Sequence, residues 1–196
     1  MSVPDEARRS GRRQLLLVAS IFIVPLVAAA ALYFSSDWRP VVNSQGTLID
    51  PPRTLTASGL YFPDGRPAPA DVFEGKWSIL HPATACDART EALFEELGRV
   101  RIALDKDTPR VRRVLLHGGN CAGAAPPAGD TDLVVFAASG PEGEAFLASI
   151  PSAVDGAPGI YLVDPHANLM MSYPAIGSAR GLLKDLERLL RLSNIG

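Results

Sequence analysis

The sequence predicts an α/β domain, with a mixed sheet flanked by helices, behind one N-terminal transmembrane helix. Three observations lead to this prediction. An uncharged apolar run lies near the N-terminus, short apolar runs alternate with segments of helical periodicity after residue 75, and the last two apolar runs are separated by about five turn-forming residues. Because the chain has 196 residues, one domain of about 160 residues, stem included, remains beyond the apolar run.

The apolar run Leu15–Phe34 carries no charged residue and is long enough to cross a bilayer as a helix. A cleaved signal peptide is the alternative, and the four alanines at 28–31 resemble a cleavage site, but a signal core is usually only about 7–15 residues long. Four arginines precede the run and only Arg39 follows it closely, which predicts that the N-terminal tail stays in the cytoplasm. We therefore expect a basic tail at 1–14 and a transmembrane helix at 15–34.

The charge balance argues against one class of partner. Residues 1–13 carry four arginines against two acidic residues, so the remainder holds 15 basic and 19 acidic residues, a net charge of about −4. Nucleic acid is excluded as an expected partner, because phosphate binding requires a positive surface. The two cysteines, Cys86 and Cys121, would lie outside the cytoplasm, where disulfides persist.

Residues 35–58 are rich in proline and glycine and are expected to form a stem or linker, so the domain is predicted at 59–196. Two short apolar pieces, at 47–49 and 59–62, suggest a hairpin-like approach to the domain. The first buried strand is expected to begin at Trp77 and to stop at Pro82.

The rest of the domain is predicted from periodicity and turn signals. Asp87 is a helix N-cap before leucines at helical spacing up to about residue 106, and Ser139 to Glu142 has capping-box spacing. The predicted elements are helices at 87–106, 139–150 and 179–192, and strands at 111–117, 132–137, 159–163 and 169–173, the last two forming a hairpin. This order is typical of a thioredoxin-like α/β domain. Arg110, Arg112 and Arg113 are expected to point outward from a solvated strand.

Four stretches carry a family resemblance: GKWSIL at 75–80, Cys86 at the head of a helix, IYLVDP at 160–165 and NLMMSY at 168–173. Together they resemble membrane-anchored Sco-like proteins of the thioredoxin superfamily, and more narrowly the small transmembrane Sco-like proteins among the assembly factors of bacterial cytochrome c oxidase. The resemblance covers 59–196 and the anchor. It implies a thioredoxin-like fold in the periplasm, held by the bacterial inner membrane, with respiratory oxidase subunits or assembly factors as partners.

The same resemblance sets an expectation about metal. Sco copper chaperones hold copper with a Cys-x-x-x-Cys pair at the start of the first helix and a distant histidine before the closing hairpin. In this sequence Cys86 matches the first position, but the second is Thr90, and the stretch 156–161 contains no histidine. The family's copper site is therefore not expected here, and no cofactor is expected, with copper as the alternative.

Cys86 is the first candidate for chemistry, because a thiol at a helix N-terminus has a lowered pKa and is more reactive. The alternative is a small buried side chain without a role. Two enzyme classes are excluded by spacing. A peroxiredoxin has a threonine three residues before its cysteine, whereas Thr84 is two before, and a dithiol oxidoreductase needs a cysteine where Arg89 stands.

Cys121 follows a predicted strand, as Cys86 does, and parallel strands ending at His81 and His117 would bring both following loops to one edge of the sheet. A Cys86–Cys121 disulfide would then close a loop of about 35 residues. Alternatively, His81, Cys86, His117 and Cys121 would form one site for Zn²⁺ or Cu(I), or the histidines are ordinary strand-end residues. The sequence leaves these alternatives open.

From these observations we expect a membrane-tethered accessory or assembly factor of a respiratory oxidase that acts by protein contact and is not an enzyme. The reason is that the anchor and the fold pattern are present, whereas the residues of the usual redox and copper chemistry are not. The alternative is a thiol-redox or copper-transfer protein that uses Cys86 and Cys121.

Overall fold

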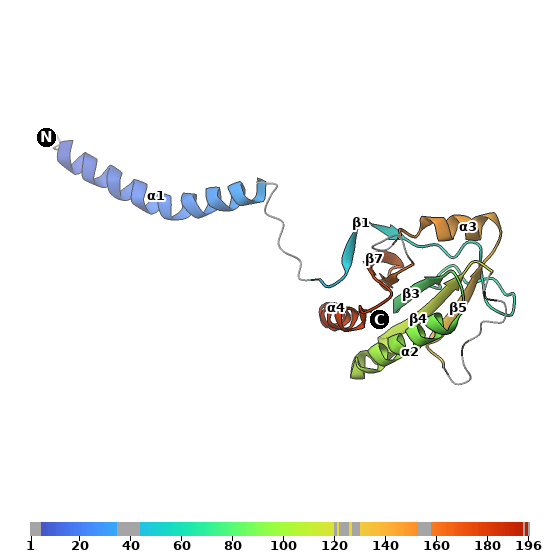
Figure 1. The fold of residues 1–196 in the computed structure, drawn as a ribbon. Coiled ribbons are helices and arrows are strands. Elements are labelled where there is room, and N and C mark those ends of the chain that lie inside the picture. Colours follow the sequence, from blue (N-terminus) through green and yellow to red (C-terminus); the bar gives the residue numbers. More distant parts are fainter. Residues whose placement is uncertain are drawn as a thin grey trace. The chain divides into compact units, whose positions relative to one another are not determined.

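The computed structural model describes residues 5–34, 44–119, 121, 126, 130–152, 158–193 and 195. The chain divides into two compact units, Met1–Asn43 and Ser44–Gly196. The described part of the first unit is the helix α1 (Asp5–Phe34), with Pro25 inside it (Figure 1). In the described part of the chain, no helix combines the length and the apolarity that a membrane crossing requires.

The second unit is built on a seven-stranded mixed sheet, in the order β1-β7-β6-β3-β4-β5-β2. Its strands are β1 (Thr47–Thr54), β2 (Leu60–Tyr61), β3 (Trp77–Ala83), β4 (Val111–His117), β5 (Leu133–Ala138), β6 (Ile160–Val163) and β7 (Asn168–Tyr173). The central strands β3, β4 and β5 are parallel, while β6 runs antiparallel to both β3 and β7. The parallel strands are almost wholly buried, as expected for a sheet covered on both faces.

Helices cover both faces of this sheet. Leucines of α2 (Ala88–Ile102) and α4 (Ala179–Leu192) pack on one face with Trp77 and Ile79, and Phe146 of α3 (Gly140–Ser149) packs on the other with Leu80 and Leu116. A 3₁₀ turn, η1 (Asp105–Arg110), joins α2 to β4. Figure 1 shows α2 in front of the strands and α3 above them. The predicted thioredoxin-like architecture, a mixed sheet between helices, is confirmed.

Most predicted elements are present within a few residues of their expected bounds, but β3 is longer than predicted. It continues through Pro82 to Ala83, pairing there with β4. On its other side the pairing with β6 ends at Leu80, so among the described residues Pro82 has a partner strand on one side only. Prolines within sheets are found where a strand has an unpaired side.

The expected hairpin-like approach was wrong. β1 pairs with β7 at one edge of the sheet and β2 pairs with β5 at the other, so the two segments lie at opposite edges. β1 also falls within the segment 35–58 that was expected to be a stem, which places part of that segment in the sheet. Residues 35–43 of the expected stem lie outside the described residues.

Candidate functional site at the carboxyl edge of the sheet

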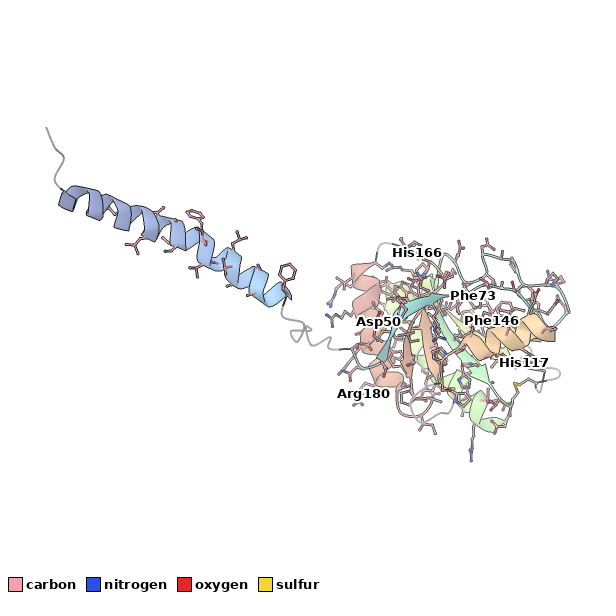
Figure 2. All side chains as sticks on the ribbon, turned by 90° about the horizontal axis from the view of Figure 1, so that it is seen from above. Asp50, Phe73, His117, Phe146, His166 and Arg180 are labelled. Atoms are coloured by element: carbon pink, nitrogen blue, oxygen red, sulfur yellow. A yellow bond between two sulfur atoms is a disulfide. The ribbon has the colours of Figure 1, made fainter. Side chains whose placement is uncertain are left out.

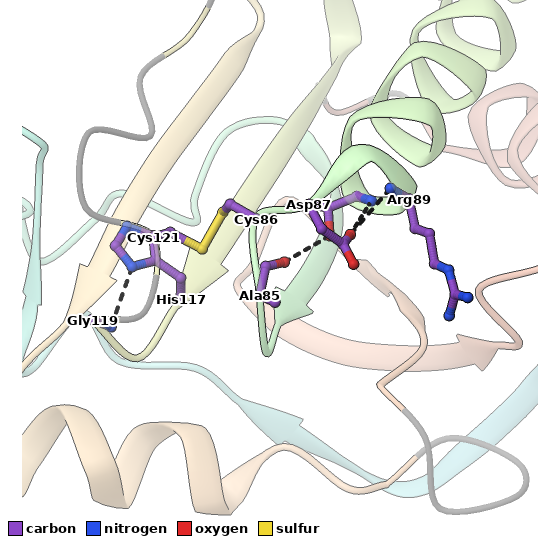
Figure 3. The surroundings of a disulfide bond; sticks show 8 residues. Ala85, Cys86, Asp87, Arg89, His117, Gly119 and Cys121 are labelled. Carbon is purple, nitrogen blue, oxygen red and sulfur yellow. Dashed lines mark hydrogen bonds between the residues drawn. A yellow bond between two sulfur atoms is a disulfide. The ribbon is translucent and has the colours of Figure 1, made fainter.

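A disulfide joins the loops that follow β3 and β4. The two strands are parallel and in register to their ends, with Ala83 opposite His117, so both loops leave the same edge. Cys86 and Cys121 are bonded there, with their Cα atoms 5.2 Å apart (Figure 3). Both cysteines of the chain are used in this bond. Of the alternatives that the sequence left open, the structure contains the disulfide.

The start of α2 is fixed by polar contacts next to the disulfide. Oδ1 of Asp87 accepts hydrogen bonds from the backbone N–H groups of Arg89 and Thr90, at 3.1 and 3.0 Å, as predicted for an N-cap (Figure 3). These bonds, that from Thr90 above all, lower the pKa of the Asp87 carboxyl because they favour its charged form. The Thr90 hydroxyl donates to the carbonyl oxygen of Ala85 at 2.7 Å. Thr90, at the second cysteine position of the Sco motif, therefore stabilises the loop that carries Cys86.

The two strand-end histidines are buried rather than solvated. His81 has its Nδ1 atom 2.8 Å from the carbonyl oxygen of Gly159, just before β6, and its ring meets Phe94 edge-on. Burial lowers the pKa of His81, opposed by the contact with Gly159, and burial also lowers the pKa of His117. His117 lies in the surroundings of the disulfide, where its Nδ1 accepts from the N–H of Gly119 (Figure 3).

The four candidate metal ligands therefore have different surroundings. Cys86 and Cys121 share one bond, His117 lies at the same edge, and His81 is bound to the backbone before β6. In the part of the chain that the structure describes, no three side chains of His, Cys, Asp or Glu are grouped as a metal site would need.

A groove of about 410 Å³ lies at this edge of the sheet. Its walls come from the ends of β3 and α3, from the turn after β4 and from the segment before β6. The lining residues are Pro82, Ala83, Thr84, Gly118, Leu147, Ile150, Pro151, Ser152, Pro158 and Tyr161. We call this the edge groove. It offers a mostly apolar, uncharged surface next to the two loops that the disulfide joins.

Arg113 plays a part that the sequence analysis missed. It was expected to face solvent, but it is buried on the central strand β4. Its guanidinium donates to both carboxylate oxygens of Asp130 at 2.7 Å, to Asp132 at 2.8 Å and to the carbonyl oxygen of Phe94 at 2.8 Å. It thus joins α2 to the residues that lead from Cys121 into β5. The signal in the sequence for this network was the pair Asp130 and Asp132, which stand just before the apolar run of β5.

The other two arginines of this group also have specific contacts. Arg112 donates to the Ser78 hydroxyl at 2.8 Å, and Arg110 donates to the carbonyl oxygens of Leu190 and Ser193 at the end of α4. The expectation of an outward, solvated strand was therefore wrong for Arg112, because β4 lies in the middle of the sheet, and for Arg110, because it ends η1 and binds the end of α4.

Two known family models match the chain. A family model described as a transmembrane-like, thioredoxin-like C-terminal domain matches residues 77–193. The chain belongs to this family. A second model, described as a transmembrane-like N-terminal domain, matches residues 4–36, so both parts of this transmembrane-like, thioredoxin-like protein are recognised. No curated protein sequence matches the chain.

Solved structures of similar fold include Sco proteins. Apo Sco1 from Thermus thermophilus has a TM-score of 0.56 at 17% identity, covering 77% of this chain and 99% of its own. Copper-bound yeast Sco1 has 0.55 at 13%, covering 72% and 95%. BsSco, described as a member of the Sco family of cytochrome c oxidase assembly proteins with a disulfide switch, has 0.52 at 14%, covering 74% and 99%. The predicted Sco-like fold of this family member is confirmed.

Proposed function

We propose that this chain is a membrane-tethered accessory or assembly factor of a respiratory cytochrome c oxidase, acting by protein contact without the Sco copper site. Its domain would lie in the periplasm of a bacterial cell, held by the inner membrane. The observation that carries the proposal is the chemistry of the carboxyl edge: a Sco-like fold in which Cys86 is bonded to Cys121 and Thr90 takes the second motif position. Oxidase assembly is the role described for BsSco.

Thr90 and the disulfide argue against copper transfer of the Sco type. Cu(I) is a soft ion that prefers thiolate ligands, whereas a threonine hydroxyl is a hard and neutral ligand. The Thr90 hydroxyl already donates its proton to Ala85, and the sulfur of Cys86 is not a thiolate while it is bonded to Cys121. Neither motif position therefore supplies a thiolate in the oxidised protein.

The tether is supported by the sequence of α1 and by the names of both matching family models, which describe transmembrane-like domains. The uncharged run Leu15–Phe34 has the length that a membrane-crossing helix needs. A tethered domain meets partners in the membrane plane at a high effective concentration, so a modest contact surface would suffice.

The edge groove is the surface we assign to the contact. It is uncharged and mostly apolar, and it lies beside the disulfide-linked loops, at the part of the fold where the resembling family carries its cysteine motif. The disulfide holds the two loops together, so the groove would be presented in one shape without a metal. In this proposal the disulfide has a structural role.

Co-purification of the full tagged chain with oxidase subunits from its own membranes tests the proposal. Leu147, half-buried in α3, lines the edge groove, whereas the adjacent Ala148 is exposed and does not line it. Leu147→Arg should lower the yield of oxidase subunits at least about tenfold, because an unpaired polar group in an apolar contact costs about 1–3 kcal/mol and a charge costs more, whereas Ala148→Arg should leave it unchanged. Equal recovery with both variants, or no oxidase subunit with the wild-type chain, would contradict the proposal.

A thiol-exchange or copper-transfer protein is the second candidate, and the asymmetry of the disulfide favours it. Cys86 is exposed at a helix N-terminus, whereas Cys121 is buried, so an incoming thiolate would reach the sulfur of Cys86. That attack would form a mixed disulfide at Cys86, break the bond to Cys121 and release Cys121 as a thiolate. After reduction, Cys86, Cys121 and His117 would be the candidate copper ligands at this edge, with the more distant His81 as a fourth.

Two measurements separate the candidates. A reduction potential below about −300 mV indicates a structural disulfide, whereas a value near −200 mV supports exchange chemistry. Titration of Cu(I) into the reduced protein, with a Cys86→Ser, Cys121→Ser double variant as control, tests transfer. Uptake no tighter than that of the double variant would exclude these ligands as a copper site.

A further inference from the structure

The exposed face of α4 carries a row of cations. Arg180, Lys184, Arg188 and Arg191 are all exposed, and their spacing of four, four and three residues places them on one side of the helix. The buried leucines 182, 186 and 190 lie on the opposite side. Residues 44–196 together hold 14 basic and 18 acidic residues, a net charge of −4, so this face has the opposite sign to its domain.

These cations are not used within the domain. Within the described residues, none of the four forms an ion pair, whereas the buried Arg113 and the half-buried Arg101 do. Glu187 is the one exposed acidic side chain of α4. Four positive charges against one negative charge leave this face free to attract an anionic surface.

An exposed apolar side chain and a groove lie at the start of the same helix. Ile176 precedes α4 and is 90% exposed. The groove, of about 340 Å³, is lined by Gln45, Tyr173, Pro174, Ile176, Gly177, Ser178, Arg180, Gly181 and Lys184. Figure 2 labels Arg180 at this end of α4. The combination of cations with a protruding isoleucine is typical of surfaces that bind at a membrane interface.

The chain enters the domain against this helix. Asp185 of α4 is buried, and its Oδ2 accepts hydrogen bonds from the backbone N–H groups of Gln45 at 2.8 Å and Gly46 at 3.0 Å, and from the Tyr173 hydroxyl at 3.0 Å. A Cβ on Gly181 would lie 2.8 Å from that of Gln45, so a glycine lets the chain pass close to α4. The point where the tether joins the domain is therefore fixed beside Arg180 and Lys184.

We propose that this surface, formed by Ile176, Arg180, Lys184 and the rest of the cationic face of α4, binds anionic phospholipid headgroups of the membrane that holds the tether. The proposal rests on the tether of the proposed function. With such a tether, residues 35–43 can span at most about 35 Å, a length that would let the domain reach the bilayer surface. Charge attraction is largely screened beyond about 8 Å at physiological ionic strength, so the cations would act when the tether lets this face lie at the bilayer surface. An acidic protein would match the cations but not the isoleucine.

Full-length chain reconstituted in vesicles provides the test. An environment-sensitive fluorophore is placed on Ile176→Cys, which leaves the native cysteines in their disulfide, or on Asp64→Cys in the exposed turn at the opposite edge of the sheet as a control. The vesicles contain phosphatidylcholine alone or with about one third phosphatidylglycerol. We expect quenching of the label at 176 by iodide to fall about twofold in the anionic vesicles, the label at 64 to be unaffected, and the protection to weaken with salt.

Charge-reversal variants separate local from net charge. Arg180→Glu with Lys184→Glu should abolish the protection, whereas Arg89→Glu with Lys106→Glu, which changes the net charge equally at exposed positions elsewhere, should preserve it. Equal quenching at 176 in both kinds of vesicle, or equal effects of the two double variants, would overturn the lipid surface. Protection that requires an added membrane protein, with no effect of lipid, would also overturn it in favour of an acidic protein partner.

Flotation of the same vesicles distinguishes failure of the proposed lipid-binding surface from failure of the proposed tether. A chain that floats with both kinds of vesicle but is not protected at 176 keeps its tether and lacks the lipid surface. A chain that floats only with anionic vesicles, and is protected at 176, supports the lipid surface and contradicts the tether.

Discussion

Arg113 is the centre of a buried charge network, and its guanidinium binds two separate segments, α2 and residues 130–132 before β5. It satisfies Asp130, Asp132 and the carbonyl oxygen of Phe94, all within 2.8 Å. Removing one partner of a buried ion pair leaves the other charges uncompensated, which usually costs about 3–5 kcal/mol. A lysine in its place keeps the charge but cannot reproduce the planar fork of donors.

We therefore expect Arg113→Ala to lower the free energy of unfolding by about 3–5 kcal/mol and Arg113→Lys to recover only part of it. Urea denaturation followed by circular dichroism measures both. Arg66→Ala is the control, because Arg66 forms an exposed pair with Asp64 and should cost less than about 1 kcal/mol. Similar losses for Arg66 and Arg113 would show that burial does not govern the contribution of this network.

His81 gives the domain a dependence on pH. Burial lowers its pKa in the folded state, so the unfolded chain binds a proton more readily below about pH 6.5. The stabilisation is therefore complete above that pH and is lost as the pH falls. We expect the free energy of unfolding to decrease from pH 7.5 to pH 5, and His81→Asn to reduce this decrease while an amide N–H still reaches Gly159.

Denaturation curves at several pH values check this prediction, with His166→Gln as the control at an exposed imidazole. His117 has a pKa lowered in the same direction, so the His81 variant should remove part of the slope and not all of it. An unchanged slope in His81→Asn would mean that His81 does not contribute to the acid sensitivity.

At the scale of elements, the sequence predicted the helices and strands whose buried side chains recur at a regular spacing. The α4 helix has the predicted bounds because its leucines recur on one side, and the β6–β7 hairpin follows from two apolar runs around a turn-rich loop. The approach of Cys86 to Cys121 could also be anticipated, since both follow neighbouring parallel strands. Local pattern and topology were sufficient in these cases.

Elements without a burial period were not predictable in this way. β1 is exposed along nearly its whole length and contains Pro51 and Pro52, and β2 has only two residues, so neither shows apolar alternation. The role of Arg113 depends on a central place for β4 in the sheet, which an arginine-rich segment does not suggest. The role of Asp185 depends on residues about 140 positions away in the chain.

The contact between α3 and the segment before β2 gives a prediction for an element. A Cβ on Gly143 would lie 2.7 Å from the carbonyl carbon of Ala138 and 2.8 Å from the carbonyl oxygen of Gly59, both backbone atoms. Gly59 itself has φ of +73°, which favours glycine. Alanine normally stabilises a helix by about 1 kcal/mol over glycine, but here the overlap should dominate.

We expect Gly143→Ala to lower the free energy of unfolding by about 1–3 kcal/mol, in spite of its higher helix propensity. Thermal unfolding of the variant measures the change. Glu144→Ala on the exposed side of the same helix serves as the control and should stay within about 0.5 kcal/mol of the wild type. A stabilised Gly143→Ala variant would mean that α3 can move away from the sheet without loss.

At the scale of the whole molecule, the disulfide constrains the unfolded chain more than any single contact does. It closes a loop of 35 residues that contains α2 and β4, the central part of the domain. Chain entropy predicts that reduction lowers the free energy of unfolding by about 3–4 kcal/mol.

We expect the reduced wild type and the Cys86→Ser, Cys121→Ser variant to share this lower stability in urea, and dithiothreitol to have no effect on the variant. The contact function proposed here needs the two loops held in one shape. The variant should therefore also bind its partner less well, because its loops are no longer joined at this edge of the sheet. An oxidised protein that is no more stable than the reduced one would remove the structural role of the disulfide and leave thiol exchange as the better reading of Cys86 and Cys121.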